Sequence, residues 1–258
     1  MESIYFDYNV ISYLRTNEFE DLSRKFSDIK DSKVIHFSPA HLEEIAVSAI
    51  RDKVSNDIVS AELNFLTEIA KNNALRPVTR KKLAKYSEYP IDCYKRVLQG
   101  YKGNDLAEAI DKQVIDDAHD NPAGQPREQN NVEPEEVLNK FVVKEMLAFS
   151  LFRQNYIKRE QMVDVFSWSF DDIKNDFDIF EAYTNLASNY MEKIGYNREK
   201  RKKSRSRLHD VSHIIYAAYT DVFVCGDKKL RNKAKAIYSS LNIRTQVMSV
   251  DEFVASGI

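Results

Sequence analysis

The sequence predicts an α/β fold with a mainly parallel central sheet, interrupted by a large all-helical insertion. Two observations favour this class. Short β-favouring segments alternate with amphipathic helical patterns over residues 1–50 and again over residues 207–258, which is the order expected for a parallel sheet covered by helices. Between them, residues 51–206 contain long, charged, helix-favouring segments. Because parallel strands need crossover connections, we expect the two end segments to meet in one core.

The first half of this core is expected to contain two strands and three helices. Residues 3–7 (SIYFD) form a short β-favouring run that ends in Asp7, and residues 33–38 (KVIHFS) form a second strand. Ser38 and Pro39 then begin a helix, since serine caps helices and proline is tolerated in their first turn. Between the strands, two amphipathic helices are expected from the apolar positions Val10, Ile11, Leu14, Phe19, Leu22, Phe26 and Ile29.

The second half of the core returns to the same alternation. Residues 208–219 (LHDVSHIIYAAY) predict a helix, and residues 221–225 (DVFVC) predict a buried strand that leads into Asp227. Residues 229–240 predict an amphipathic basic helix, and residues 244–250 a last strand. In the insertion, a polar loop is expected over residues 119–134, which hold three of the six prolines.

Composition excludes several classes of protein. The chain of 258 residues is 43% hydrophobic and 30% charged, which is typical of a globular protein. Its two cysteines, Cys93 and Cys225, allow neither a disulfide framework nor a zinc-knuckle spacing, and no pair of its six glycines opens a nucleotide-binding loop. No segment approaches the roughly 20 apolar residues that span a bilayer, and no secretory signal is expected. We therefore expect a cytoplasmic protein without a membrane partner.

Positive charge is concentrated in residues 197–207 (NREKRKKSRSR), which hold seven Lys or Arg and one Glu, although the whole chain carries a formal charge of −2. Such a run is usually a solvated linker, but this one enters the helix that carries Asp210. We therefore expect phosphate contacts from it. The expected nucleic-acid-binding residues are Arg201, Lys202, Lys203, Arg205 and Arg207. A second basic cluster consists of Arg76, Arg80, Lys81, Lys82 and Lys85.

Four acids are placed by this fold near one edge of the sheet. Asp7 ends the first strand and Asp227 follows the third, while Glu44 lies early in the helix that leaves the second strand. Asp210 is expected at the start of the helix that enters the third strand. Ligands of open parallel sheets bind beyond the carboxyl ends of the strands. Crowded carboxylates repel unless a cation neutralises them, and oxygen donors favour Mg²⁺ or Mn²⁺ over zinc.

Each acid also has an ordinary structural explanation. Asp7, Asp210 and Asp227 could each be the N-cap of a helix. Glu44 could be a solvated residue, and Glu43 competes with it for the site. His213, one turn after Asp210, is expected to be a buried and satisfied histidine outside the metal shell. The agreement of all four acids in order and position favours the functional interpretation.

Four segments resemble the PIN-like domain (PilT N-terminus-type) metal-dependent ribonucleases. They are FDYNVISYL (6–14), HFSPAHLEEIA (36–46), DVSHIIYAAY (210–219) and FVCGDKKL (223–230). The resemblance implies a PIN-like α/β/α sandwich whose catalytic and metal-binding residues are Asp7, Glu44, Asp210 and Asp227, with Asn9 supporting the site. Cys225 departs from the pattern, because the family commonly has Thr or Ser there. The long insertion also has no counterpart in the small members of the family.

These observations predict a Mg²⁺- or Mn²⁺-dependent endonuclease that hydrolyses phosphodiester bonds, in RNA rather than DNA. The resemblance also implies products with 5′-phosphate and 3′-hydroxyl ends, and a role as a toxin or defence effector. The expected partner is nucleic acid, and a protein regulator or antitoxin and a homo-oligomer are compatible with the sequence. Two alternatives stay open. One is a nucleic-acid-binding module with a degenerate site, and the other is a phosphatase of the haloacid dehalogenase type, which needs a second Asp where this chain has Asn9.

Overall fold

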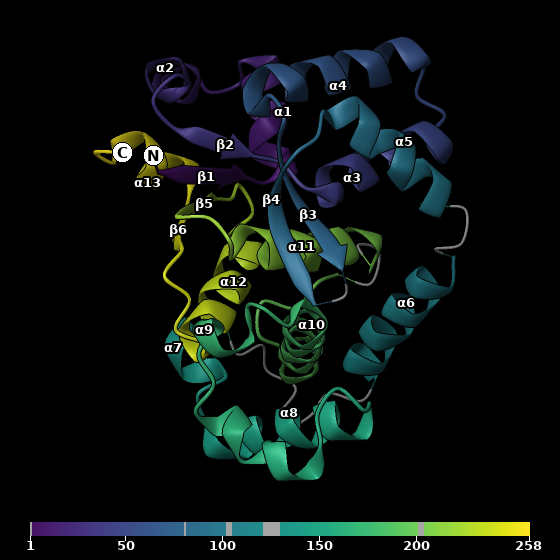
Figure 1. Cartoon of the computed structure of the whole chain (residues 1–258), viewed down its shortest axis with the longest axis vertical. Coiled ribbons are helices and arrows are strands. Elements are labelled where there is room, and N and C mark those ends of the chain that lie inside the picture. The colour runs from purple at the N-terminus through teal and green to yellow at the C-terminus, as the bar shows by residue number, and fades with distance from the viewer. Residues whose placement is uncertain (1, 80, 102–104, 121–129, 201–203) are drawn as a thin grey trace.

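The computed structural model describes residues 2–79, 81–101, 105–120, 130–200 and 204–258 (Figure 1). The side chains of residues 101, 105–108, 111 and 204–208 are outside this description. In the described part of the chain, no helix is both long enough and apolar enough to cross a membrane.

The core is a parallel sheet of four strands in the order β2-β1-β5-β6. The strands are short: β1 spans Ser3–Phe6, β2 Val34–His36, β5 Val222–Val224 and β6 Gln246–Met248. β1 lies at the centre and pairs in parallel with β2 on one side and with β5 on the other. The two ends of the chain therefore meet in one sheet, and the prediction of an α/β fold with a mainly parallel sheet is confirmed.

Side chains on the two faces of β1 enter two different hydrophobic clusters. Ile4 and Phe6 pack in one cluster with Val10 and Leu42, whereas Tyr5 packs in the other with residues from the C-terminal half. This division follows from the two-residue period of a strand, which points successive side chains to opposite faces. Both faces of the sheet are covered, as expected for parallel strands.

Three helices follow the first two strands. They are α1 (Tyr8–Thr16), α2 (Glu20–Ile29) and α3 (Pro39–Ile50). α3 begins as predicted, with Pro39 in its first turn and a capping box in which the side chains of Ser38 and His41 bond to each other's backbone. This cap fixes the direction in which α3 leaves the carboxyl end of β2.

The C-terminal half contains α11 (Ser204–Ala217), α12 (Lys228–Ser240) and α13 (Val250–Ala255). The expectation that Asp210 lies at the start of its helix is wrong, because α11 begins at Ser204 and Asp210 lies well inside it. Arg205 and Arg207 belong to the helix, since Arg is a good helix former. The last strand is shorter than predicted, because Ser249 begins α13 with a capping box to Glu252.

The prediction that residues 51–206 are all helical is also wrong. β3 (Asn73–Thr79) and β4 (Lys82–Ser87) form an antiparallel hairpin. Phe37 N donates to Asn73 O at 3.1 Å and Leu75 N donates to Phe37 O at 2.7 Å, so the hairpin is joined to the chain just after β2. Its charged side chains are good helix formers, but burial of Leu75 and these backbone bonds outweigh that preference.

The other elements of the middle segment surround the core on two sides (Figure 1). α4 (Asn56–Ala70) and α5 (Pro90–Tyr101) contribute to the cluster that contains Ile4 and Phe6. The remaining elements contribute mainly to the cluster that contains Tyr5. They are α7 (Pro134–Val137), α8 (Phe141–Arg153), η1 (Arg159–Met162), η2 (Asp164–Phe166), α9 (Phe170–Ile173) and α10 (Phe177–Ile194), while α6 (Asp105–Asp120) packs against α10 and α11.

Candidate active site

Asp7 joins the end of β1 to the end of β5. It follows β1 directly, and it is only 1% exposed. Its Oδ1 accepts a hydrogen bond from Val10 N at 2.7 Å, and its Oδ2 accepts one from Gly226 N at 3.0 Å. Asp7 is therefore the N-cap of α1, as one structural explanation anticipated, and it also places a carboxylate at the carboxyl edge of the sheet.

The Cys225 thiol supports this carboxylate. Burial raises the pKa of Asp7, and hydrogen bonds from Val10 N and from the Cys225 thiol partly oppose the rise. Cys225 is fully buried, and its Sγ also lies 3.4 Å from Asp227 O. The thiol is thus a hydrogen-bond donor at the position where the resemblance implies Thr or Ser.

Asp227 is the N-cap of α12. Its Oδ1 accepts hydrogen bonds from Lys229 N at 2.6 Å and from Leu230 N at 3.2 Å. The residue before it must be small, because a Cβ on Gly226 would lie 3.0 Å from the Tyr13 ring. The close approach of α1 to the end of β5 thus brings Asp227 towards Asp7.

Asp210 lies on α11 within electrostatic reach of three other acids. Burial is the main reason that the pKa of Asp210 lies well above its ordinary value, and repulsion by Glu44, Glu199 and Asp227 raises it further. The ammonium of Lys233 opposes this rise. The charges of Glu44, Glu199 and Asp227 are therefore close enough to disfavour the ionisation of Asp210.

Glu44 and Glu43 both lie next to histidines of α11. Glu44 Oε1 is 2.8 Å from His213 Nε2, and Glu43 Oε2 is 3.6 Å from His209 Nδ1. Burial raises the pKa of Glu44. Repulsion by Glu44 adds to the effect of burial on the pKa of Asp210, so the Glu44 carboxylate lies within electrostatic reach of Asp210.

His213 connects Glu44 to the interior of the sheet. Its Nδ1 lies 2.8 Å from the Tyr5 hydroxyl, which lies 2.6 Å from Ser38 Oγ. Burial lowers the pKa of His213 to about 4, so the ring is neutral at pH 7. A neutral ring that donates from Nε2 to the Glu44 carboxylate must accept at Nδ1, and the Tyr5 hydroxyl therefore donates to it.

His41 is fixed in a second neutral ring beside this chain. Its Nδ1 accepts from Ser38 N at 3.1 Å, so the proton is on Nε2, which donates to Phe6 O at 2.9 Å. Burial lowers the pKa of His41 to about 3. The sequence did not reveal this network, because Tyr5 sits in an apolar strand where an aromatic residue is expected to be core.

A buried ion cluster brings the middle segment to the acids. Lys233 Nζ lies 2.6 Å from Glu192 Oε1 and 3.5 Å from Glu199 Oε1, and all three side chains are less than 10% exposed. Glu192 is on α10, Lys233 is on α12, and Glu199 follows α10. Sequence reasoning missed this cluster. Its signal was the spacing of Lys233 between Leu230 and Ile237, which places a lysine on the apolar face of α12.

A pocket of about 570 Å³ opens beside these acids. It is lined by Asn9, Tyr13, Glu199, Lys200, Gly226, Asp227, Lys228 and Lys229. Asn9 and Asp227, which the resemblance placed in the site, thus lie next to three lysines that sequence reasoning did not single out. One of these, Lys229, donates to Arg198 O.

The predicted basic segment lies largely beyond the description. Arg201, Lys202 and Lys203 are outside the described residues, and Arg205 and Arg207 are on α11, where their side chains are not described. Of the second basic cluster, Arg80 is outside the described residues, whereas Lys81, Lys82 and Lys85 are exposed on the hairpin.

Oxygen donors dominate the acid cluster, which is the chemistry that Mg²⁺ and Mn²⁺ prefer. Repulsion between the acids is the kind of cost that a divalent cation relieves. Among the described residues, no group of three or more His, Cys, Asp or Glu side chains is arranged to hold a metal ion. Asp7 and Asp227 direct oxygens to backbone N–H groups, so metal binding would require their carboxylates, or those of Asp210 and Glu44, to turn.

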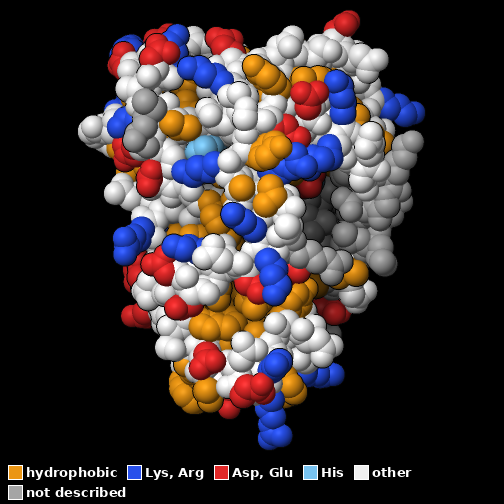
Figure 2. Space-filling view, in the orientation of Figure 1, with side chains coloured by type: hydrophobic (Ala, Val, Ile, Leu, Met, Phe, Trp, Pro, Cys, Tyr) orange, Lys and Arg blue, Asp and Glu red, His pale blue; other side chains and the backbone are white. Residues whose placement is uncertain are grey.

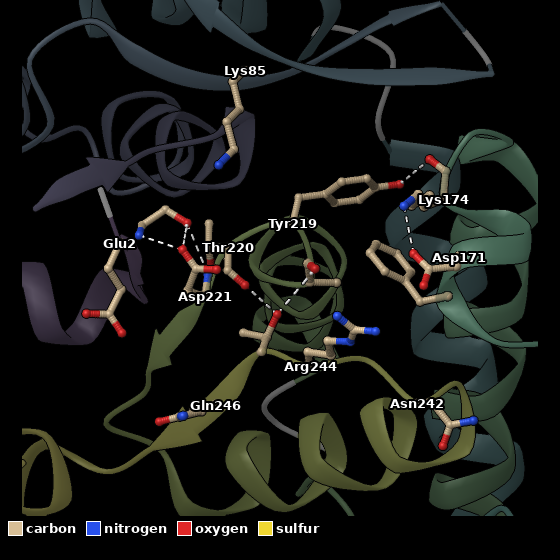
Figure 3. Close-up of a pocket in the computed structure, with 14 residues that line it drawn as sticks. Glu2, Lys85, Asp171, Lys174, Tyr219, Thr220, Asp221, Asn242, Arg244 and Gln246 are labelled. Atoms are coloured by element: carbon tan, nitrogen blue, oxygen red, sulfur yellow. Dashed lines mark hydrogen bonds and ion pairs between the residues drawn. The ribbon is translucent and has the colours of Figure 1, made fainter. Parts of the chain in front are cut away.

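A larger pocket, of about 780 Å³, lies at the opposite edge of the sheet (Figure 3). Asp221 lies at this edge, directly before β5, and its Oδ2 accepts hydrogen bonds from both N and Oγ of Ser3 at 2.7 Å. These bonds join the starts of β1 and β5, so Asp221 has a structural role. Lys174, on the far side of the pocket, pairs with Asp171 at 2.7 Å.

Comparison of the chain with protein-family models, with curated proteins and with solved structures finds no match.

Proposed function

We propose that this protein is a metal-dependent endonuclease with a PIN-like core, which hydrolyses phosphodiester bonds in RNA rather than DNA. One observation carries the proposal. Asp210 lies within electrostatic reach of Glu44 and Asp227, and Asp7 accepts a hydrogen bond from Gly226 N, next to Asp227, beyond the carboxyl ends of β1 and β5. Ligands of open parallel sheets bind at this edge. Burial, together with repulsion from Glu44 and Asp227, raises the pKa of Asp210, so the ionised form of this acid is disfavoured in the fold.

A bound divalent cation would offset the repulsion that the other acids exert on Asp210. Asp210 and Glu44 would hold Mg²⁺ or Mn²⁺, together with Asp7 and Asp227 once their carboxylates turn. When bound, such an ion lowers the pKa of a coordinated water and neutralises charge on a phosphodiester. The neutral His213 would orient Glu44, because its Nε2–H donates to one oxygen of the carboxylate.

The adjoining pocket supports a polyanionic substrate. Lys200 and Lys228 are exposed at its rim, next to Asp227. Cations beside a nuclease site hold the phosphates that flank the scissile bond. The preference for RNA, and a role as a toxin or defence effector under a protein regulator, rest on the resemblance of the four segments.

A nucleic-acid-binding module with a degenerate site is the second candidate. It is favoured by the N-caps, because both oxygens of Asp7 and Oδ1 of Asp227 accept backbone hydrogen bonds. Such a protein would use the lysines of the pocket and leave the phosphodiester bond intact.

The test incubates the purified protein with RNA and single-stranded DNA pools in Mg²⁺, in Mn²⁺ or in EDTA. The variant Asp210→Asn removes an acid of the cluster, and Asp164→Asn is the matched control, since Asp164 is exposed on η2. We expect cleavage of RNA that requires the metal, is lost in Asp210→Asn and is unchanged in Asp164→Asn.

Two other results would decide against the enzyme. Salt-sensitive RNA binding without cleavage, by folded protein in either metal, would support the binding module. Cleavage that persists in Asp210→Asn would place the activity outside the proposed site.

A further inference from the structure

α8 is apolar around nearly its whole circumference. Its inner face is buried through Val143, Leu147 and Leu151. On its outer face, Val142 is 72% exposed and Phe149 is 50% exposed. A helix that is hydrophobic on all sides is normally buried on all sides, so the outer face of α8 lacks a covering partner within the described chain.

Neighbouring residues extend this apolar surface. Phe141 is 68% exposed, and its ring lies 4.8 Å from that of Phe166 on η2, while Val163 beside η2 is 71% exposed. In Figure 2, hydrophobic side chains gather over the lower part of the molecule, where Figure 1 places α8. Contiguous apolar patches on a folded protein usually mark an interaction site.

Two charges on the same face show what kind of partner fits. Glu145 and Arg153 are exposed, and neither has an ion-pair partner among the described residues. They lie four residues before and four residues after Phe149, so all three side chains share one face of the helix. Each charge is therefore about 6 Å along the helix axis from Phe149, in opposite directions.

This spacing is complementary to itself. If two copies of α8 pack antiparallel around a two-fold axis at Phe149, Glu145 of each copy faces Arg153 of the other copy. The two Phe149 rings then meet at the centre, and Val142 packs towards the far end of the second helix. An isologous contact of this kind needs the same patch on both subunits, which a single apolar helix with opposite charges at its ends supplies.

We propose that the outer face of α8 binds a second copy of this chain, and that the protein is a symmetric homodimer through an antiparallel α8–α8 contact. The contact is independent of the proposed nuclease activity, because α8 lies at the opposite end of the molecule from the sheet (Figure 1). Both acid clusters stay accessible in such a dimer.

The test measures the molar mass of the purified full chain by light scattering and sedimentation over a range of concentrations. We expect a dimer for the native chain and a monomer for Phe149→Glu, which places two carboxylates at the two-fold axis. Glu68→Arg is the control, because Glu68 is an exposed residue of α4 and should leave the dimer intact.

Charge reversal tests the register. In Glu145→Arg or in Arg153→Glu alone, both ion pairs become repulsive, and we expect dimerisation at least about tenfold weaker. Mixing the two single variants restores both pairs, so the mixture should form a heterodimer with native affinity. Circular dichroism of each variant checks that α8 is still folded.

Three outcomes would overturn the proposal. One is a native chain that stays monomeric at about 100 µM, because a specific contact of this kind should have a dissociation constant below that concentration. Another is a dimer that survives Phe149→Glu. The third is a pair of folded charge variants that fail to associate when mixed, since the antiparallel register predicts that they must.

Discussion

Replacing Lys233 with methionine is expected to destabilise the protein more than any ordinary surface substitution. The Lys233 ammonium lies 2.6 Å from Glu192 Oε1 and 3.5 Å from Glu199 Oε1, and its side chain is 5% exposed. Methionine fills a similar volume but leaves two buried carboxylates without the ammonium that they share. The same ammonium also opposes the rise that burial causes in the pKa of Asp210, so its removal acts on a third acid.

The size of this effect follows from the burial of the pair. Removing one partner of a buried ion pair costs about 3–5 kcal/mol, compared with a total folding free energy of about 5–15 kcal/mol. For a chain of this size each kcal/mol lowers the melting temperature by about 2–4 °C, so the expected fall is roughly 6–20 °C. The loss should be smaller at about pH 5 than at about pH 8. Burial raises the pKa of Asp210 and the Lys233 ammonium opposes that rise, so without the ammonium the ionisation of Asp210 costs more stability as the pH rises.

Urea unfolding followed by circular dichroism measures the change, with Lys235→Met as the matched control. Lys235 is on the same helix but is only half-buried, so its replacement should cost less than about 1 kcal/mol. Adding Glu192→Gln to Lys233→Met should recover part of the loss, since a neutral amide does not need a cation. A cost of Lys233→Met below about 1 kcal/mol at both pH values would refute the reasoning.

Two further predictions concern the acids of the candidate site. Because burial and repulsion raise the pKa of Asp210, its ionisation costs stability as the pH rises above the ordinary aspartate value. Asp210→Asn should therefore melt at a higher temperature than the native protein at about pH 8 and at the same temperature near pH 3, and a lower melting temperature at pH 8 would contradict this. The Cys225 thiol lowers the pKa of Asp7. Cys225→Ala should therefore make stability fall more steeply as the pH rises from about 4 to about 7. Cys225→Ser places a stronger hydrogen-bond donor there and should make stability fall less steeply over the same range. Equal slopes in pH-dependent melts would show that the thiol does not act on Asp7.

Local chemistry along the chain was sufficient to predict much of the core. The strand that ends in Asp7, the helix that begins at Ser38 and Pro39, and the strand that leads to Asp227 all have signals within a few residues. Such signals act through backbone geometry and capping, which depend on near neighbours. They predicted the alternation of strands and helices. They also indicated that Asp7 and Asp227 could be N-caps of helices, as an alternative to a role in the site.

Predictions from local chemistry were wrong where a contact between residues far apart in the sequence determines the structure. The hairpin of β3 and β4 has helix-favouring charges, but it forms because Leu75 is buried and bonds to Phe37, which lies far away in the sequence. The start of α11 was misplaced for a different reason, since Arg205 and Arg207 lie within the helix although their basic segment is typical of a linker.

The acids of the candidate site were likewise predicted from the sequence only in part. From residue type and order alone, the sequence determined that Asp7 and Asp227 follow strands of one parallel sheet and that Asp210 lies on a helix of the same core. Only the tertiary structure decided that Glu44 lies against a neutral His213 and that the charges of Glu44 and Lys233 act on Asp210. The physical reason is that burial and charge interactions are set by groups that meet in space, and in this chain those groups lie as far apart in sequence as Glu44 and His213.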